Sequence, residues 1–110
     1  LNMADVLRSQ FGITKTDTAY EITVGGSKVW TVLSISICNT EAADDGTFDL
    51  YVDTDGSGAD AYIYKAQALP GGATFIHSDK IVLAAGLKLG FVATASQDID
   101  VVVTYLEQDV

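Results

Sequence analysis

Hydrophobic and polar residues alternate with a period of two along most of the chain, beginning near residue 18. Tyr20, Ile22 and Val24 alternate with more polar neighbours, and two glycines follow them. This period is that of a β-strand with one buried face, and glycines supply a turn because they adopt positive φ at little steric cost. The longest apolar stretch, 29–39, predicts a long strand. The residues expected to share its inner face are Leu33, Ile35 and Ile37.

Shorter stretches repeat the alternation and are separated by turn sequences. Phe48, Leu50 and Val52 form one apolar row. The segment 69–72, Leu-Pro-Gly-Gly, predicts a tight turn because proline presets φ and glycine takes positive φ. Further strands are expected over residues 61–67, 73–76, 80–83, 87–95 and 99–106.

These elements predict an all-β fold: an antiparallel two-sheet sandwich of about eight strands, jelly-roll-like, over residues 18–110. An immunoglobulin-like sandwich is the alternative. It fits less well because Cys38 has no second cysteine to pair with, and Trp30 precedes it rather than following it.

Residues 1–17 differ from the rest and predict an N-terminal arm that becomes ordered against something else, with a frayed terminus as the alternative. Met3, Val6 and Leu7 could line one face of a short helical turn, which is too short to be stable alone.

The second face of several predicted strands is more apolar than a solvated sheet requires. We expect a surface shared with other chains and a closed homo-oligomer, a homotrimer. The apolar residues on this face are Trp30, Val32, Tyr51, Ile63, Val92, Val102 and Leu106. The expected partner-binding residues are Met3, Val6, Leu7, Trp30, Val32 and Ile63.

Charge narrows the classes of partner. The 110 residues carry six Lys and Arg against fifteen Asp and Glu, a net charge of -9. The cations are scattered singly, whereas binding to phosphates needs clustered Lys and Arg, so we expect no nucleic-acid partner and no membrane-surface partner. No uninterrupted stretch of ~20 apolar residues is present.

One acidic loop has metal-binding character. Asp53, Asp55, Ser57 and the glycine after it match the first half of an EF-hand calcium loop, and Asp60 could add an oxygen. The second half does not match, because Tyr64 stands where a bidentate glutamate is needed. We therefore favour a solvated hairpin loop and expect no cofactor, with Ca²⁺ as the alternative.

No catalytic constellation is apparent. His77 is the only histidine, and its neighbours Ser78 and Asp79 cannot form a triad with it because adjacent strand residues point to opposite faces. We expect a protein that is not an enzyme. Three tyrosines near the acidic loop could instead stack on sugars, which makes a carbohydrate-binding module the main rival. They are Tyr51, Tyr62 and Tyr64.

Four stretches carry a family resemblance. In order they are AYEITVGGSKVWTVLSISICNTE at 19–41, TFDLYV at 47–52, AYIYKAQALPGGATFIHSDKIVLAAGLKLGFVATA at 61–95 and DIDVVVTYLE at 98–107. In their order and texture they resemble small β-sandwich virion proteins of tailed bacteriophages, of the head decoration (cement) type.

The resemblance implies a structural protein on the outer surface of the capsid. Its partner would be the major capsid protein, whose subunit contacts it would stabilise. The alternative is a tail or fibre component, or a carbohydrate- or receptor-binding sandwich.

Overall fold

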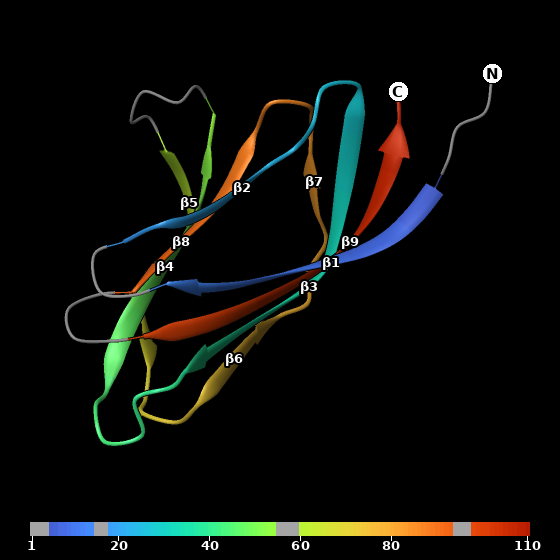
Figure 1. Ribbon diagram of the computed structural model, residues 1–110. Coiled ribbons are helices and arrows are strands. Elements are labelled where there is room, and N and C mark those ends of the chain that lie inside the picture. The colour runs from blue at the N-terminus through green and yellow to red at the C-terminus, as the bar shows by residue number, and fades with distance from the viewer. Residues whose placement is uncertain (1–4, 15–17, 55–59, 94–97) are drawn as a thin grey trace.

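The computed structural model describes residues 5–14, 18–54, 60–93 and 98–110, and it contains two antiparallel β-sheets stacked face to face (Figure 1). No helix is present in these ranges. The strands are β1 (Asp5–Thr14), β2 (Tyr20–Thr23), β3 (Lys28–Asn39), β4 (Gly46–Asp53), β5 (Asp60–Leu69), β6 (Thr74–His77), β7 (Ile81–Leu83), β8 (Lys88–Ala93) and β9 (Ile99–Asp109).

The strand order is that of a jelly roll. The five-stranded sheet runs β1-β9-β3-β6, with β7 also paired to β3, and the four-stranded sheet runs β2-β8-β4-β5. Because β6 pairs with residues 35–38 of β3 and β7 with residues 30–32, these two short strands share one position in the sheet. Eight strand positions in two sheets result. The predicted antiparallel, jelly-roll-like sandwich is confirmed.

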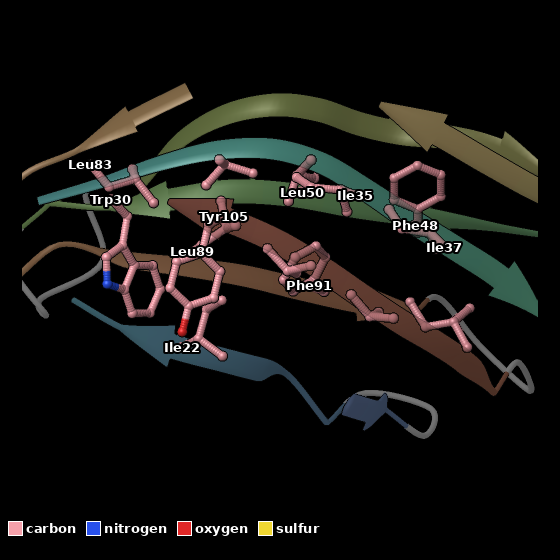
Figure 2. Close-up of a cluster of buried hydrophobic side chains, with 14 of the residues drawn as sticks. Ile22, Trp30, Ile35, Ile37, Phe48, Leu50, Leu83, Leu89, Phe91 and Tyr105 are labelled. Carbon is pink, nitrogen blue, oxygen red and sulfur yellow. The ribbon is translucent and has the colours of Figure 1, made fainter. Parts of the chain in front are cut away.

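The hydrophobic core fills the space between the sheets. Phe91 and Leu89 point inward from β8, and Val101 and Val103 point inward from β9. Figure 2 shows Trp30 and Tyr105 at one end of this layer and Phe48 and Ile37 at the other. The large side chains that are almost completely buried are Phe48, Phe91, Ile35, Ile37, Leu50, Leu83, Leu89 and Ile99.

A bulge in β3 changes which of its side chains face the core. The register between β3 and β9 shifts between Val32 and Ser34, so Leu33 is an extra residue. Trp30 and Val32 therefore face the core on one side of the bulge, and Ile35 and Ile37 face it on the other. The prediction that Leu33 would share a face with Ile35 and Ile37 is wrong, because strict alternation was assumed through this point.

Residues 5–14, assigned to an arm by the sequence, form strand β1 instead. β1 pairs with β9 without interruption from Asp5 opposite Gln108 to Thr14 opposite Ile99. Gly12 permits this position because a β-carbon there would overlap the ring of Tyr20, which lies against the strand. The predicted domain division at residue 17 therefore does not separate a free arm from the sandwich.

Asn39 fastens two loops at one end of the sandwich. Its side chain is buried and donates hydrogen bonds to the carbonyl oxygens of Asp44 (2.9 Å) and Leu69 (3.1 Å). Its Oδ1 accepts a bond from the Glu41 amide at 2.9 Å. The loop after β3 and the turn after β5 are thus held by one amide group.

Replacing Asn39 by alanine should lower the free energy of unfolding by about 2–3 kcal/mol, because buried backbone groups lose their partners. Urea denaturation followed by tryptophan fluorescence measures this loss. The control is Thr40→Ala, which removes only an exposed bond to the Asp98 carbonyl and should cost less than about 1 kcal/mol. Equal losses in the two variants would contradict the role given to Asn39.

Candidate interaction face

The side of the five-stranded sheet that points away from the core is largely apolar and is named here the outer face. Leu7, Phe11 and Ile13 on β1 are 70%, 72% and 70% exposed. At the opposite edge, Ile76 of β6 and Val82 of β7 are 63% and 67% exposed. The residues between them are Val102, Thr104 and Leu106 of β9 and Thr31, Ser34, Ser36 and Cys38 of β3.

Charge is confined to the two ends of the outer face. Among the described residues of its strands, the charged side chains that point outward are Asp5, opposite Gln108, and Asp100, opposite Ile13. The chain has a net charge of -9, so a region of this size without charged side chains means that the charges are distributed unevenly over the surface. Burying this uncharged region in a contact costs little electrostatic desolvation energy.

The size of the outer face suits a protein contact. Four strand positions at ~4.8 Å and about ten residues at ~3.3 Å give about 600 Å². A standard interface buries ~800 Å² on each partner. A hollow of about 440 Å³ lies where β1 meets β9 and is lined by Phe11, Gly12, Ile13, Asp100, Val101 and Val102.

The inner side of β1 makes polar contacts instead. Arg8 Nε lies 3.1 Å from Glu107 Oε1, and the indole N–H of Trp30 donates to Glu107 Oε2 at 2.8 Å. Gln10 Nε2 donates to the Tyr105 hydroxyl at 3.0 Å. β1 is therefore held by its backbone ladder and by a few polar bonds, and it buries little apolar area.

The expected partner-binding residues are divided between surface and core. Leu7 lies on the outer face, and Val6 lies on the other side of β1 and is partly exposed. Trp30 and Val32 are in the core and cannot form a docking surface, because the bulge turns them inward. Ile63 is half-buried and packs against the core. Met3 lies outside the described residues.

Four exposed apolar residues of the outer face were not predicted: Phe11, Ile13, Ile76 and Val82. The first two lie in a segment where Leu7, Phe11 and Ile13 occupy odd positions, which fits a strand period interrupted at Ser9. That signal could have identified β1 from the sequence. Ile76 and Val82 belong to strands too short to show a period.

The opposite side of the molecule, on the four-stranded sheet, is polar. Tyr51 lies over Gly90, where a β-carbon would overlap the ring, and its hydroxyl donates to Glu21 Oε2 at 2.8 Å. Burial, with the neighbouring Glu21 carboxylate, raises the pKa of the Tyr51 hydroxyl. This hydroxyl therefore stays protonated and keeps donating.

Of the three tyrosines expected to stack on sugars, one keeps an exposed ring. Tyr62 is 47% exposed, and Lys65 Nζ lies 4.4 Å from its ring centre while also contacting Asp49 at 3.1 Å. Tyr64 points inward, where its hydroxyl lies 2.9 Å from His77 Nδ1. The three rings do not form a common platform.

The calcium candidate is described only at its ends. Asp53 and Asp60 are opposite each other in the β4–β5 register, while Asp55 and Ser57 lie outside the described residues. Within the described ranges, no group of three or more His, Cys, Asp or Glu residues is placed to hold a metal ion.

His77 lies on β6 and contacts Tyr64 of β5, which belongs to the other sheet. It is buried and packs edge-on against Tyr64, which in turn packs against Phe75. Its surroundings give it a packing role.

The part of the chain that the structure describes has no helix long and apolar enough to cross a membrane. Comparison with protein-family models, with curated proteins and with solved structures gave no match to this chain.

Proposed function

We propose that this protein is a structural virion protein that decorates a tailed-phage capsid, binding the outside of the head and stabilising contacts between major capsid protein subunits. The observation that carries the proposal is the outer face of the five-stranded sheet, which is largely apolar and carries charge only at its two ends, in a strongly acidic chain. A face of this kind stays in water at a cost, and contact with a second surface removes that cost.

The outer face acts as the docking surface. It is built on a sheet whose other side is packed into the core, so it binds as a rigid body with little ordering cost. Burial of its apolar area at ~25 cal/mol per Å² supplies the favourable term. The sandwich is bound by the assembled shell and not by free subunits, and it therefore stabilises the shell by mass action.

Charge supports the outside of the capsid as the location. A chain of net charge -9 is repelled by the phosphates of packaged DNA and is well solvated on an outer surface. The acids Glu21, Asp49 and Asp53 lie on the four-stranded sheet, opposite the outer face. That sheet would face solvent in the bound protein.

Self-association remains part of the proposal, but the surface for it changes. The expected homotrimer was to be held partly by Trp30 and Val32, which lie in the core. Copies must therefore meet through other residues.

The copy number in purified virions tests the function. We expect this protein in numbers comparable to the major capsid protein, measured by quantitative mass spectrometry of purified particles. A few copies confined to the tail would contradict decoration. That result would favour the rival proposal, a fibre or glycan-binding module acting through the exposed Tyr62 and the acidic loop beside it.

A further inference from the structure

β1 is the only long and regular edge among the edge strands that the structure describes. β2 has four residues, and β6 and β7 have four and three. β5 has ten residues, but two register shifts interrupt it, Lys65 stands within it, and Ala66 has a positive φ of 51°. Short length, bulges and lysines are the devices that keep sheet edges from pairing with other chains.

β1 is long and has no bulge, and the one cation within it, Arg8, is paired with Glu107. It runs for ten residues in unbroken register with β9, and its sequence DVLRSQFGIT contains neither proline nor lysine. An edge of this kind is a template for another strand.

Its free backbone groups can be assigned residue by residue. At the two ends of β9, the Asp98 carbonyl accepts a hydrogen bond from the Thr40 amide, and the Val110 amide donates one to the Ser27 carbonyl. The backbone N–H and C=O groups of the even-numbered residues of β9 therefore point toward β3. The backbone groups of the odd-numbered residues of β9 consequently point toward β1. In β1 they are paired with the even-numbered residues. The outward-pointing N–H and C=O groups of β1 belong to its odd-numbered residues Asp5, Leu7, Ser9, Phe11 and Ile13.

One contact agrees with this assignment. The Phe11 carbonyl, which points away from β9, accepts a hydrogen bond from the Tyr20 hydroxyl at 3.2 Å. A carbonyl oxygen has two lone pairs, so this bond leaves room for a strand partner.

We propose that two copies of this chain pair through β1, antiparallel, about a two-fold axis that passes beside Ser9. In this register Ser9 faces Ser9 of the second copy, Leu7 faces Phe11, and Arg8 faces Gln10. The apolar pair Leu7–Phe11 thus lies on the outer side of the sheet, and the polar pair Arg8–Gln10 lies on the inner side. Each pair occurs twice because of the two-fold symmetry. The inference is independent of capsid binding.

The same register avoids repulsion and places Val6 well. Asp5 lies opposite Ile13, so no two like charges are opposite each other, although each copy carries a net charge of -9. Val6 lies opposite Gly12, whose inner side is covered by the Tyr20 ring. A shift by two residues would put Arg8 there instead.

The symmetry has a geometric consequence. A two-fold axis normal to the sheet keeps both outer faces on the same side, so the two faces of about 600 Å² become one of about 1,200 Å². The contact is isologous and closes at two copies, which avoids open-ended association. The dimer replaces the homotrimer expected from the sequence.

Light scattering on the purified protein at micromolar concentration tests the pairing. The wild type should have the mass of a dimer, and so should Ser9→Thr. Ser9→Pro should be a monomer, because it removes an outward N–H that the second copy needs while the ladder to β9 keeps its bonds. Its melting temperature, extrapolated to low protein concentration, should stay close to that of Ser9→Thr.

A cysteine variant tests the register and does not depend on the folding of Ser9→Pro. In a Cys38→Ser background, Ser9→Cys should form an intermolecular disulfide on mild oxidation, because hydrogen-bonded antiparallel pairs have Cα atoms ~5.5 Å apart. The control Thr23→Cys, on the exposed edge strand β2, should stay reduced.

A wild-type mass of one or three chains, or a dimer that persists in Ser9→Pro, would overturn the pairing. So would the absence of the Ser9→Cys disulfide. A monomer that still coats heads in high copy number would refute the dimer and leave decoration standing.

Discussion

Replacing Ile35 by alanine should lower the free energy of unfolding by about 2–5 kcal/mol, a large part of the ~5–15 kcal/mol that stabilises a typical domain. Ile35 is completely buried between the sheets, so truncation removes apolar contacts and leaves a cavity. Urea denaturation at low protein concentration measures the effect.

The chain provides a matched control on the neighbouring strand. Ile76 of β6 lies on the outer face and is 63% exposed, beside the strand that carries Ile35. Ile76→Ala removes the same atoms and should change the stability by less than about 0.5 kcal/mol. Similar losses at the two positions would mean that the face assignment after the β3 bulge is incorrect.

The second large effect concerns the capsid binding that we propose for the outer face. The double variant Ile76→Glu with Val82→Glu should weaken binding to phage heads that lack this protein by at least about tenfold. The reason is that it buries two unpaired carboxylates in the contact. Both positions are exposed in the free protein, so folding should be retained. Co-sedimentation with the heads measures the binding.

The control adds the same charge to the other sheet. Thr23 and Ala68 are exposed on the four-stranded sheet, and Thr23→Glu with Ala68→Glu should bind heads like the wild type. Equal weakening in the two double variants would show that net charge matters and the outer face does not. Ile76 and Val82 lie at the opposite edge of the sheet from β1, so the double variant at these positions leaves the proposed dimer intact.

The strands with uninterrupted alternation were predictable from the sequence. The inner rows of β8 and β9 follow from a period of two because both strands are central in their sheets and contain no bulge in their own chain. Each of these strands is paired with a strand on both edges, so only one register buries its apolar row in the core.

β3 was predicted only in part, because its bulge reverses the alternation at Leu33. The residues Trp30 to Ile37 are nearly all apolar or small, so the sequence holds no local sign of where the reversal occurs. The register shift is set by pairing with β9, which is distant in the chain.

The residues of the outer face were predicted only in part. Leu7, Val102 and Leu106 were expected on a surface shared with other chains, and they lie on the outer face. Trp30 and Val32 were assigned to the wrong face, because the prediction assumed that β3 has no bulge. The neighbours that complete the face come from β1 and from the two short strands β6 and β7, whose positions depend on tertiary pairing.

The pairing of β1 with β9 also has a consequence for how the chain folds during synthesis. β9 lies between β1 and β3, and the ion pair of Arg8 with Glu107 joins residues 99 positions apart. β1 leaves the ribosome before β9 and can pair only after β9 has been made, so the five-stranded sheet closes only after both strands have emerged. Folding dominated by such distant pairs is slow, and during the delay Leu7, Phe11 and Ile13 are carried on an unpaired segment open to chaperones and to neighbouring chains.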